Sequence, residues 1–291
     1  MIKDWLIGIL RVPDTGETLA YDADTQRLSG GDESFSAEDG IPSFVSETPS
    51  PTGFDYTKHY ALDAEAFDYF RERTDKLTAT HLRLLRTTVL KLVPKTATLL
   101  LDVGCGCAFV AEHCCPEGKK VVSMDIARTN TQKALAKFPF ENHAAVVADA
   151  YHLPFADQTF DCIIASEIIE HTVDPQGFIA SLLTKLKSDG TLIISTPYKE
   201  QIAYSLCIHC NCKTPHNAHL HSFDKDKMRQ IIAPLPAEIT NMRLVGNKLL
   251  LRTHLAVLLS KLGLPLWRLV DRLHNLIIPK AEHFIITVRK R

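Results

Sequence analysis

The feature that most constrains this chain's fold is an alternation of short apolar runs with amphipathic segments, which begins at Thr96. The apolar runs have the length of buried strands, and the segments between them have helical spacing. This alternation predicts an α/β fold with a doubly wound sheet covered by helices on both faces. Strands are expected near 98–103, 120–125, 143–148, 160–166, 191–196 and 284–289, and helices near 107–115, 128–137, 174–187 and 224–233.

The rest of the chain divides around this domain. Residues 1–45 hold short strand-like runs broken by Gly and Asp, which predict a small β-rich module. Residues 46–94 are expected to form a linker followed by helices. The α/β domain itself is expected over 95–291, with a Cys- and His-rich insertion at 200–222 and a long helical stretch at 247–280.

Composition excludes several classes of protein. Hydrophobic residues make up 45% and charged residues 23%, which is a globular balance. The net charge of −1 gives no reason to expect a nucleic-acid partner. All eight cysteines lie from Cys105 onward, which indicates reduced thiols in a cytoplasmic protein rather than a disulfide scaffold. Asp4 precedes only a short apolar stretch, so the start is a poor secretory signal.

The chemistry is expected where the first strand of the domain ends. That strand leads into Gly104-Cys105-Gly106 and then a helix, so backbone and helix N–H groups can approach a ligand. A dinucleotide site is disfavoured, because Phe109 stands where its third glycine belongs and the carboxylate of Asp102 would repel a pyrophosphate. A carboxylate there suits a cationic ligand that carries an ammonium and a sulfonium group.

Two further acids follow the next two strands. Asp125 stands about 20 residues beyond the glycines, the offset at which a carboxylate binds ribose hydroxyls. Asp149 follows the third strand and could accept a hydrogen bond from an adenine amino group. Each acid alone is typical of a turn or a helix cap. Acids after three successive strands together predict a site.

These motifs resemble the class I S-adenosylmethionine-dependent methyltransferases, and most closely the small-molecule branch that includes quinone-biosynthesis enzymes. The resemblance covers residues 96–200 well and the final strand loosely, and it implies a Rossmann-like sheet with an antiparallel last strand. Ala108 departs from the family, which usually has a third glycine there. The motifs that carry it are Asp102-Val-Gly-Cys-Gly106, Asp125, Asp149-Ala150, Leu153-Pro154-Phe155 and Phe160-Asp161-Cys-Ile-Ile164.

The resemblance implies S-adenosylmethionine as cofactor and a role for each matching residue. Gly104 and Gly106 would pass under its methionine part, while Asp102 would meet its amino group. Asp125 would hold the ribose, and Asp149 would flank the adenine. The full set of expected cofactor contacts is Asp102, Gly104, Cys105, Gly106, Asp125, Ile126, Asp149, Ala150 and Ser166.

Candidate catalytic residues follow the fourth strand. Glu167, Glu170 and His171 are spaced so that a helical turn would gather them on one side. His171 is the first choice for a general base that deprotonates an oxygen acceptor. The spacing also resembles the divalent-metal motif of quinone-ring and small-RNA 2′-O-methyltransferases, with His221 as a further ligand. The alternative is that the Glu-His pair only braces the fold.

The insertion at 200–222 and the first 45 residues suggest zinc in different ways. Cys207, Cys210 and His219, with Cys212 or His216 as a fourth ligand, match a structural zinc site. The alternative is a loop of free thiols and solvated histidines. Residues 1–45 resemble the zinc-ribbon module that accompanies or activates methyltransferases. They lack its cysteine pairs, so they are expected to be a metal-free packing or substrate-side module.

The stretch 247–280 is rich in leucine and interrupted by basic residues. No run reaches the roughly 20 apolar residues of a membrane span. The helices fit a lid over the substrate pocket, simple packing on the domain, or peripheral contact with a membrane surface. A lipophilic acceptor would suit the lid and the membrane contact equally.

The sequence therefore predicts a methyltransferase that acts at oxygen or carbon of a small, lipophilic acceptor. One alternative is a metal-assisted RNA 2′-O-methyltransferase, against which the balanced charge speaks. The other is a non-catalytic scaffold that binds an adenosyl ligand. The acceptor and the oligomeric state are not indicated by the sequence.

Overall fold

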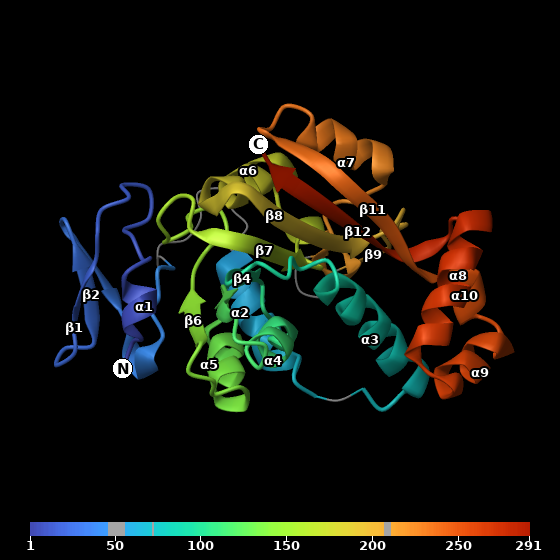
Figure 1. Cartoon of the computed structure of the whole chain (residues 1–291), viewed down its shortest axis with the longest axis horizontal. Coiled ribbons are helices and arrows are strands. Elements are labelled where there is room, and N and C mark those ends of the chain that lie inside the picture. The colour runs from blue at the N-terminus through green and yellow to red at the C-terminus, as the bar shows by residue number, and fades with distance from the viewer. Residues whose placement is uncertain (46–55, 72, 207–210) are drawn as a thin grey trace.

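The computed structural model describes residues 1–45, 56–71, 73–206 and 211–291, and a seven-stranded sheet forms its centre. The strands stand in the order β11-β12-β8-β7-β4-β5-β6, as Figure 1 shows. The pairs among β4, β5, β6, β7 and β8 are parallel, whereas β12 is antiparallel to both of its neighbours. The predicted fold class is confirmed. The strands are β4 Leu99–Val103, β5 Lys120–Asp125, β6 His143–Val147, β7 Phe160–Ser166, β8 Leu186–Pro197, β11 Ala237–Asn247 and β12 Ala281–Lys290.

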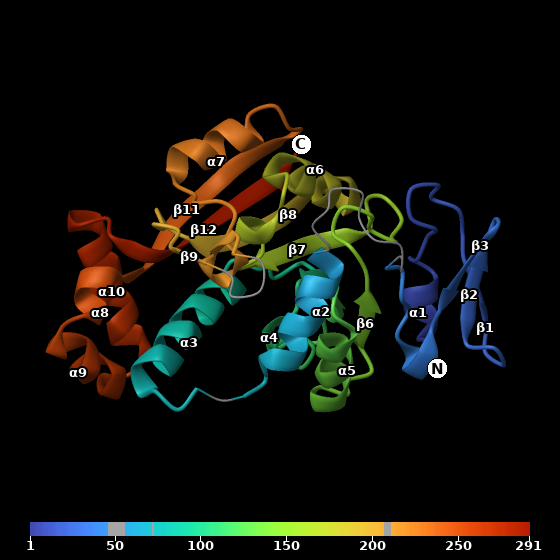
Figure 2. The same ribbon diagram turned by 180° about the vertical axis from the view of Figure 1, so that it is seen from behind.

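Helices cover both faces of this sheet, because successive strand side chains point to opposite sides. Leu101 packs on the face covered by α6, α7 and the N-terminal module, and Leu100 on the face covered by α3, α4 and α8 to α10. Figure 2 shows the arrangement from behind. The helices are α2 Tyr56–Ala66, α3 Lys76–Leu90, α4 Phe109–Cys114, α5 Arg128–Lys137, α6 Pro175–Lys185, α7 Lys225–Ile232, α8 Lys248–Leu251, α9 His254–Leu262 and α10 Leu264–Ile277.

Three helices begin at acidic caps. The carboxylate of Asp75 accepts a hydrogen bond from the Thr78 backbone N–H, and the carboxylate of Asp174 accepts one from that of Gln176. Asp224 caps α7 in the same way, through two backbone N–H groups. Each cap satisfies donors that the first helical turn would leave unpaired. These local signals explain why the predicted helices after residue 170 begin within a residue of the observed ones.

The first 45 residues form a small module against the edge of the sheet. Its helix α1 (Asp4–Ile7) precedes a three-stranded antiparallel sheet of β1 (Ala20–Asp22), β2 (Arg27–Gly30) and β3 (Glu33–Ser36). The segment after β3 then pairs with the outer edge of β6. The Val147 N–H donates to the Pro42 carbonyl at 2.8 Å, and the Phe44 N–H donates to the Val147 carbonyl at 2.8 Å. The resemblance of this module to a zinc ribbon stays a prediction.

The prediction missed β11. It is an edge strand in which only the first residue and the last three are buried, so its sequence lacks the apolar run that marks the central strands. The following stretch is helical as predicted, in the form of α8, α9 and α10. Among the described residues, no helix combines the length and the apolar character that crossing a bilayer requires.

Candidate functional site

The predicted cofactor residues follow the carboxyl ends of the parallel strands. The order of the strands reverses between β4 and β7, because the chain moves outward through β5 and β6 and then returns to place β7 and β8 on the other side of β4. In doubly wound sheets, ligands bind in the crevice at such a reversal. Asp102, Asp125 and Asp149, here called the carboxylate group, come from the ends of β4, β5 and β6.

Asp102 is the least satisfied member of the carboxylate group. Its side chain is buried, and its Oδ2 has no hydrogen-bond partner among the described residues. Burial raises the pKa of Asp102 well above its usual range, and the neighbouring Asp125 raises it further, while the Arg86 guanidinium opposes both. An unpaired buried oxygen costs free energy until a donor reaches it. The amino group of a bound amino acid would be such a donor.

Asp125 is held in place by the glycine turn. Its Oδ2 accepts hydrogen bonds from the Gly106 N–H and the Asn130 side-chain amide, both at 3.2 Å. Its Oδ1 accepts one from the Ala127 N–H at 3.0 Å, and the Cys105 thiol lies 3.9 Å from Oδ2. Burial raises the pKa of Asp125, although these donors oppose the shift. The structure thus brings the predicted ribose carboxylate and the predicted methionine loop together.

The glycine turn needs glycine at its first position. Gly104 has a φ of +64°, and a Cβ there would lie 2.1 Å from the Cδ1 of Ile168. Ala108 also has a positive φ, +54°, and caps α4 at the place where the family usually has glycine. Left-handed backbone costs an L-residue about 1–2 kcal/mol. Alanine is therefore accommodated at Ala108 at some conformational cost.

The remaining predicted contacts extend the site to both sides. Asp149 accepts a hydrogen bond from the Tyr151 N–H at 3.0 Å, and Ile126 and Ala150 are half-buried beside the carboxylate group. Ser166 lies across the reversal at the end of β7. Its hydroxyl is 2.8 Å from the Ser195 hydroxyl of β8, and Ser195 in turn donates to the Glu167 carboxylate, so Ser166 is linked to that residue through Ser195.

Sequence reasoning missed the contribution of α2 and the residues after it. The Tyr69 hydroxyl donates to the Asp63 carboxylate, and the Tyr69 ring lies 3.7 Å from the position of a Cβ on Gly106. Tyr60 packs edge-on against His171, with ring centroids 5.7 Å apart. Burial raises the pKa of both tyrosines. The tyrosines among the apolar positions of 54–94 were the sequence signal that could have indicated this contribution to the site.

The side chains of the predicted catalytic residues Glu167 and Glu170 point to different partners. Glu167 has a φ of +60° and stands before the short 3-10 turn Ile169–His171, so the expected single helical turn does not form. The Glu167 carboxylate binds Ser195 at 2.7 Å and His283 of β12 at 2.9 Å. The buried Glu170 carboxylate instead accepts from the Thr196 hydroxyl at 3.0 Å. Burial raises the pKa of Glu170 well above its usual range, and Glu167 adds to the shift.

His219, predicted as a zinc ligand with cysteines, lies beside Glu170 and His171. One ligand atom from each of these three side chains lies within 4.8 Å of the other two. Backbone hydrogen bonds from Leu220 and His221 to the Glu170 carbonyl hold the segment there. The Glu200 carboxylate reaches the His219 Nδ1 at 2.6 Å. Glu167, Glu170, His171, His219 and His283 are here called the histidine group.

Of the other predicted metal ligands, those that the structure describes do not join the histidine group. Cys207 and Cys210 lie outside the described residues. Cys212 and His216 are exposed, on either side of β10 (Lys213–Pro215), which pairs with β9 (Tyr204–Leu206). The His221 Nε2 lies 3.4 Å from the Val173 carbonyl. The predicted zinc site stays a prediction.

A buried histidine from α3 adjoins the histidine group. The His81 ring stacks on His283 with centroids 5.1 Å apart, and a Cβ on Gly246 would lie 1.9 Å from it. Neither ring nitrogen of His81 has a hydrogen-bond partner among the described residues. Burial lowers the pKa of His81 to about 4, and His283 adds to the shift. His81 is therefore neutral at physiological pH.

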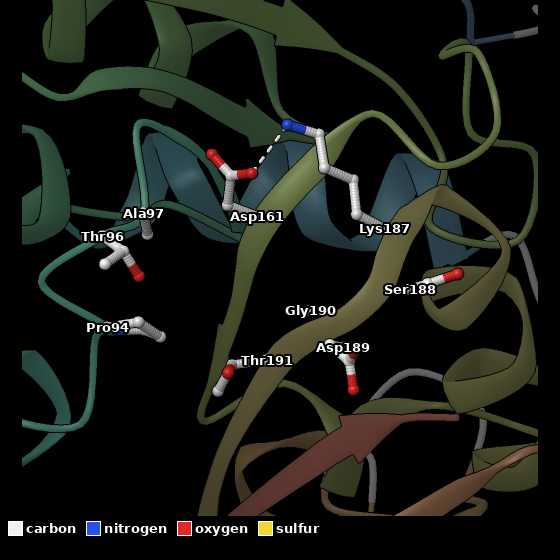
Figure 3. Close-up of a pocket in the computed structure, with 9 residues that line it drawn as sticks. All are labelled: Pro94, Thr96, Ala97, Asp161, Lys187, Ser188, Asp189, Gly190 and Thr191. Carbon is white, nitrogen blue, oxygen red and sulfur yellow. Dashed lines mark hydrogen bonds and ion pairs between the residues drawn. The ribbon is translucent and has the colours of Figure 1, made fainter.

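Two hollows lie outside the crevice. One, of about 160 Å³, lies at the amino ends of β7 and β8, where Asp161 pairs with Lys187 (Figure 3). Asp161 also accepts from the Thr98 and Leu99 N–H groups, and Lys187 together with these donors outweighs burial and lowers the pKa of Asp161 to about 2. Because it faces away from the strand reversal, this hollow belongs to the scaffold. The second, of about 290 Å³, is bordered by Glu200 and adjoins the histidine group.

Comparisons with known proteins find a methyltransferase domain within this chain. A family model described as "Methyltransferase domain" matches residues 101–194. The mitochondrial ubiquinone biosynthesis O-methyltransferase of Bos taurus is 31% identical over 127 residues, which cover 40% of this chain and 33% of that protein. The Rickettsia bellii (strain OSU 85-389) enzyme of the same name is 33% identical over 111 residues, covering 38% and 46%. The chain thus spans between a third and a half of these curated relatives.

Solved structures share the fold across more of the chain. The cyclase SpnF covers 84% of this chain and 97% of its own, with a TM-score of 0.57 and 16% identity. The 1,6-didemethyltoxoflavin-N1-methyltransferase of Burkholderia thailandensis, solved with bound S-adenosylhomocysteine, covers 94% and 98%, with a TM-score of 0.53 and 15% identity. Since a cyclase and an N-methyltransferase share this fold, the fold alone does not decide the reaction.

Proposed function

Because the chain contains a class I S-adenosylmethionine-dependent methyltransferase domain, we propose that it transfers the methyl group of S-adenosylmethionine to a small, lipophilic acceptor. The single observation that carries the proposal is Asp102, a buried carboxylate with an unpartnered oxygen beside the glycine turn. This oxygen fits the ammonium group of the methionine part. When bound, the donor supplies a methyl group on a sulfonium, which needs no activation by the protein.

The carboxylate group and the turn would bind and orient this donor. Gly104 and Gly106 leave their backbone bare where the methionine part would pass. Asp125 would exchange some of its present hydrogen bonds for the ribose hydroxyls, and Asp149 would accept from the adenine amino group. Tyr69 would help to exclude water from the Gly106 side. Such positioning can lower a barrier by roughly 7–11 kcal/mol in favourable cases.

His171 is proposed as the base that removes the acceptor proton. Its Nδ1 lies 3.3 Å from the Ala218 carbonyl, so a proton on Nδ1 leaves the Nε2 lone pair able to accept another. Burial lowers the pKa of His171 to about 4, and His219 adds to the shift. The imidazole is therefore neutral at physiological pH and keeps its lone pair unprotonated, while the same burial makes it a weaker base than an exposed histidine.

An alternative role for the same residues is metal binding, because Glu170, His171 and His219 fit a divalent cation, and His171 would then be a ligand instead of the base. They offer one carboxylate oxygen and two imidazole nitrogens within 4.8 Å of one another, which is the donor set of many catalytic metal sites. Glu200 behind His219 resembles the outer carboxylates that orient metal-binding histidines. A cation there would lower the pKa of an acceptor hydroxyl. His219→Ala should abolish metal retention, whereas His152→Ala, at an exposed histidine that pairs with Asp14, should not.

The O-methyltransferase names of the relatives favour an oxygen acceptor. The balanced net charge of −1 speaks against the alternative of an RNA 2′-O-methyltransferase. We also propose a cytoplasmic location with contact at a membrane surface.

Titration calorimetry with S-adenosylhomocysteine, followed by transfer of labelled methyl into metabolite extracts, tests the proposed methyl transfer. Asp125→Ala should weaken binding by roughly 1–3 kcal/mol, because the partners of the carboxylate are left unpaired. Absence of binding by the unmodified protein would overturn the proposal.

A further inference from the structure

We infer that the outer face of α9 and α10 docks on an anionic lipid surface. This face lies at the end of the molecule opposite the N-terminal module (Figure 1). The inference deepens the proposed lipophilic acceptor, but it does not depend on methyl transfer, because lipid binding can be measured without either substrate.

The first observation is an exposed apolar stripe along α10. Its members are spaced three and four residues apart, so they share one side of the helix. The last two, Leu276 and Ile277, are 73% and 80% exposed. The opposite side is buried through Trp267, Asp271 and Asn275. The exposed members of the stripe are Leu266, Leu269, Leu273, Leu276 and Ile277.

The preceding helix continues the apolar surface. On α9, Leu255, Leu258 and Leu262 are exposed at the same spacing, while Leu259 is buried. The two helices pack against one another, and both also contact α3. Monomeric proteins rarely expose contiguous apolar surface of this kind unless it meets a partner or a membrane.

The second observation is the charge of the surrounding residues. Residues 248–280 carry six Lys and Arg side chains and one acid, so this segment is +5 while the rest of the chain is −6. The one acid, Asp271, is buried and accepts hydrogen bonds from the Gly246 and Asn247 N–H groups, so it does not offset the basic surface. The basic residues that are exposed are Arg252, Lys261, Arg272 and Lys280. Arg268 instead donates to the Thr87 hydroxyl of α3, and Lys248 is half-buried near His283.

This charge distinguishes a membrane from a second copy of the chain. A twofold dimer through this face would place two like-charged surfaces together, because such an interface uses the same patch on both copies. An anionic bilayer instead attracts the basic residues and takes up the leucine side chains between them. The occupant that fits both observations is therefore a surface of anionic lipid.

The helices α9 and α10 are also linked to the histidine group through packing contacts. Helix α3 lies between the two, since it packs against α9 and α10 and carries His81, which stacks on His283. A chain docked through α9 and α10 would therefore hold the histidine group one helix away from the lipid. A lipophilic acceptor would have a short path from the bilayer to the site.

Vesicle co-sedimentation of the full chain tests the inference. Vesicles of phosphatidylcholine alone should bind little, and those that also contain phosphatidylglycerol should bind strongly at low salt and more weakly at high salt. The Leu276→Asp/Ile277→Asp variant should lower the lipid partition coefficient by at least about tenfold, because it removes apolar contact and adds negative charge. Leu206→Asp, at an exposed leucine of β9, is the matched control and should bind like the unmodified chain.

The other outcomes overturn the inference. Equal binding by the double variant, or no binding to anionic vesicles, would show that this face does not meet lipid. A concentration-dependent dimer in sedimentation velocity that the double variant abolishes would assign the face to a second copy. Unchanged circular dichroism and S-adenosylhomocysteine affinity in the variant would exclude misfolding. Failure of the unmodified chain to bind S-adenosylhomocysteine would sink the proposed activity and leave the lipid result intact.

Discussion

The carboxylate group and the histidine group lie at the same end of the sheet, but different contacts hold them. Asp125 and Asp149 accept hydrogen bonds from backbone N–H groups two residues away, and Asp102 is held by its strand. Members of the histidine group are held by side chains and carbonyls far along the chain, such as His283 for Glu167 and Ala218 for His171. Apart from the Gly106 N–H that donates to Asp125 from the turn after the neighbouring strand, the donor half is therefore built from local contacts, whereas the acceptor half depends on contacts between distant segments.

This difference predicts how each half fails when it is altered. A change in the carboxylate group should weaken donor binding and leave the rest of the site in place. A change in the histidine group should lower turnover while donor binding persists, because the two groups share no hydrogen bond among the described residues. Changes in the histidine group and in the glycine turn test this separation, and the pH dependence of stability tests the buried His81 that adjoins the histidine group.

The largest effect is expected from His171→Ala. Loss of a positioned general base or metal ligand should lower kcat by about 10²–10⁴-fold. The affinity for S-adenosylhomocysteine should stay the same, because His171 lies outside the carboxylate group. Single-turnover kinetics and calorimetry on one preparation would measure both. A large loss of donor affinity would show that the two halves are not independent.

A smaller effect is expected from the pH dependence of stability. The pKa of folded His81 is about 4, below the roughly 6.5 of an unfolded histidine, so the unfolded chain takes up the proton first as the pH falls. Stability should therefore be lost as the pH drops through 6.5 toward 4, by about 3 kcal/mol for this side chain, with His283 and Glu167 as its charged neighbours. Urea unfolding of His81→Leu should show a shallower loss between pH 7 and pH 5. An identical slope in both proteins would contradict the assignment.

The smallest effect is expected in the glycine turn. Gly104→Ala adds a left-handed alanine that costs about 1–2 kcal/mol, and its Cβ would meet Ile168. Gly118→Ala is the matched control, since Gly118 also has a positive φ but no atom within 4 Å of an added Cβ. Both variants should lose stability in thermal melts, and only Gly104→Ala should also lose donor affinity. Restored affinity in Gly104→Ala/Ile168→Ala would confirm the contact.

The same contrast explains what could be predicted from the sequence. The carboxylate group follows three apolar runs directly, so strand periodicity and one motif located it. To predict the histidine group, one would have to know that β12 pairs with β8 and that segment 216–221 returns to the Glu170 carbonyl. Neither pairing leaves a local pattern. For the same reason the sequence does not indicate that His219 lies beside Glu170 and His171, and His81, His283 and Glu200 were missed.

The pairing of the N-terminal module with β6 has a consequence for the chain as a whole. The Pro42 carbonyl and the Phe44 N–H form hydrogen bonds with the backbone of Val147 on β6, the outermost strand of the parallel part of the sheet. Without them, the N–H and carbonyl groups of Val147 would face water. An open edge of that kind is a template on which another chain can add a strand. At Val147 the first 45 residues therefore occupy the backbone groups on which another chain could begin to add a strand.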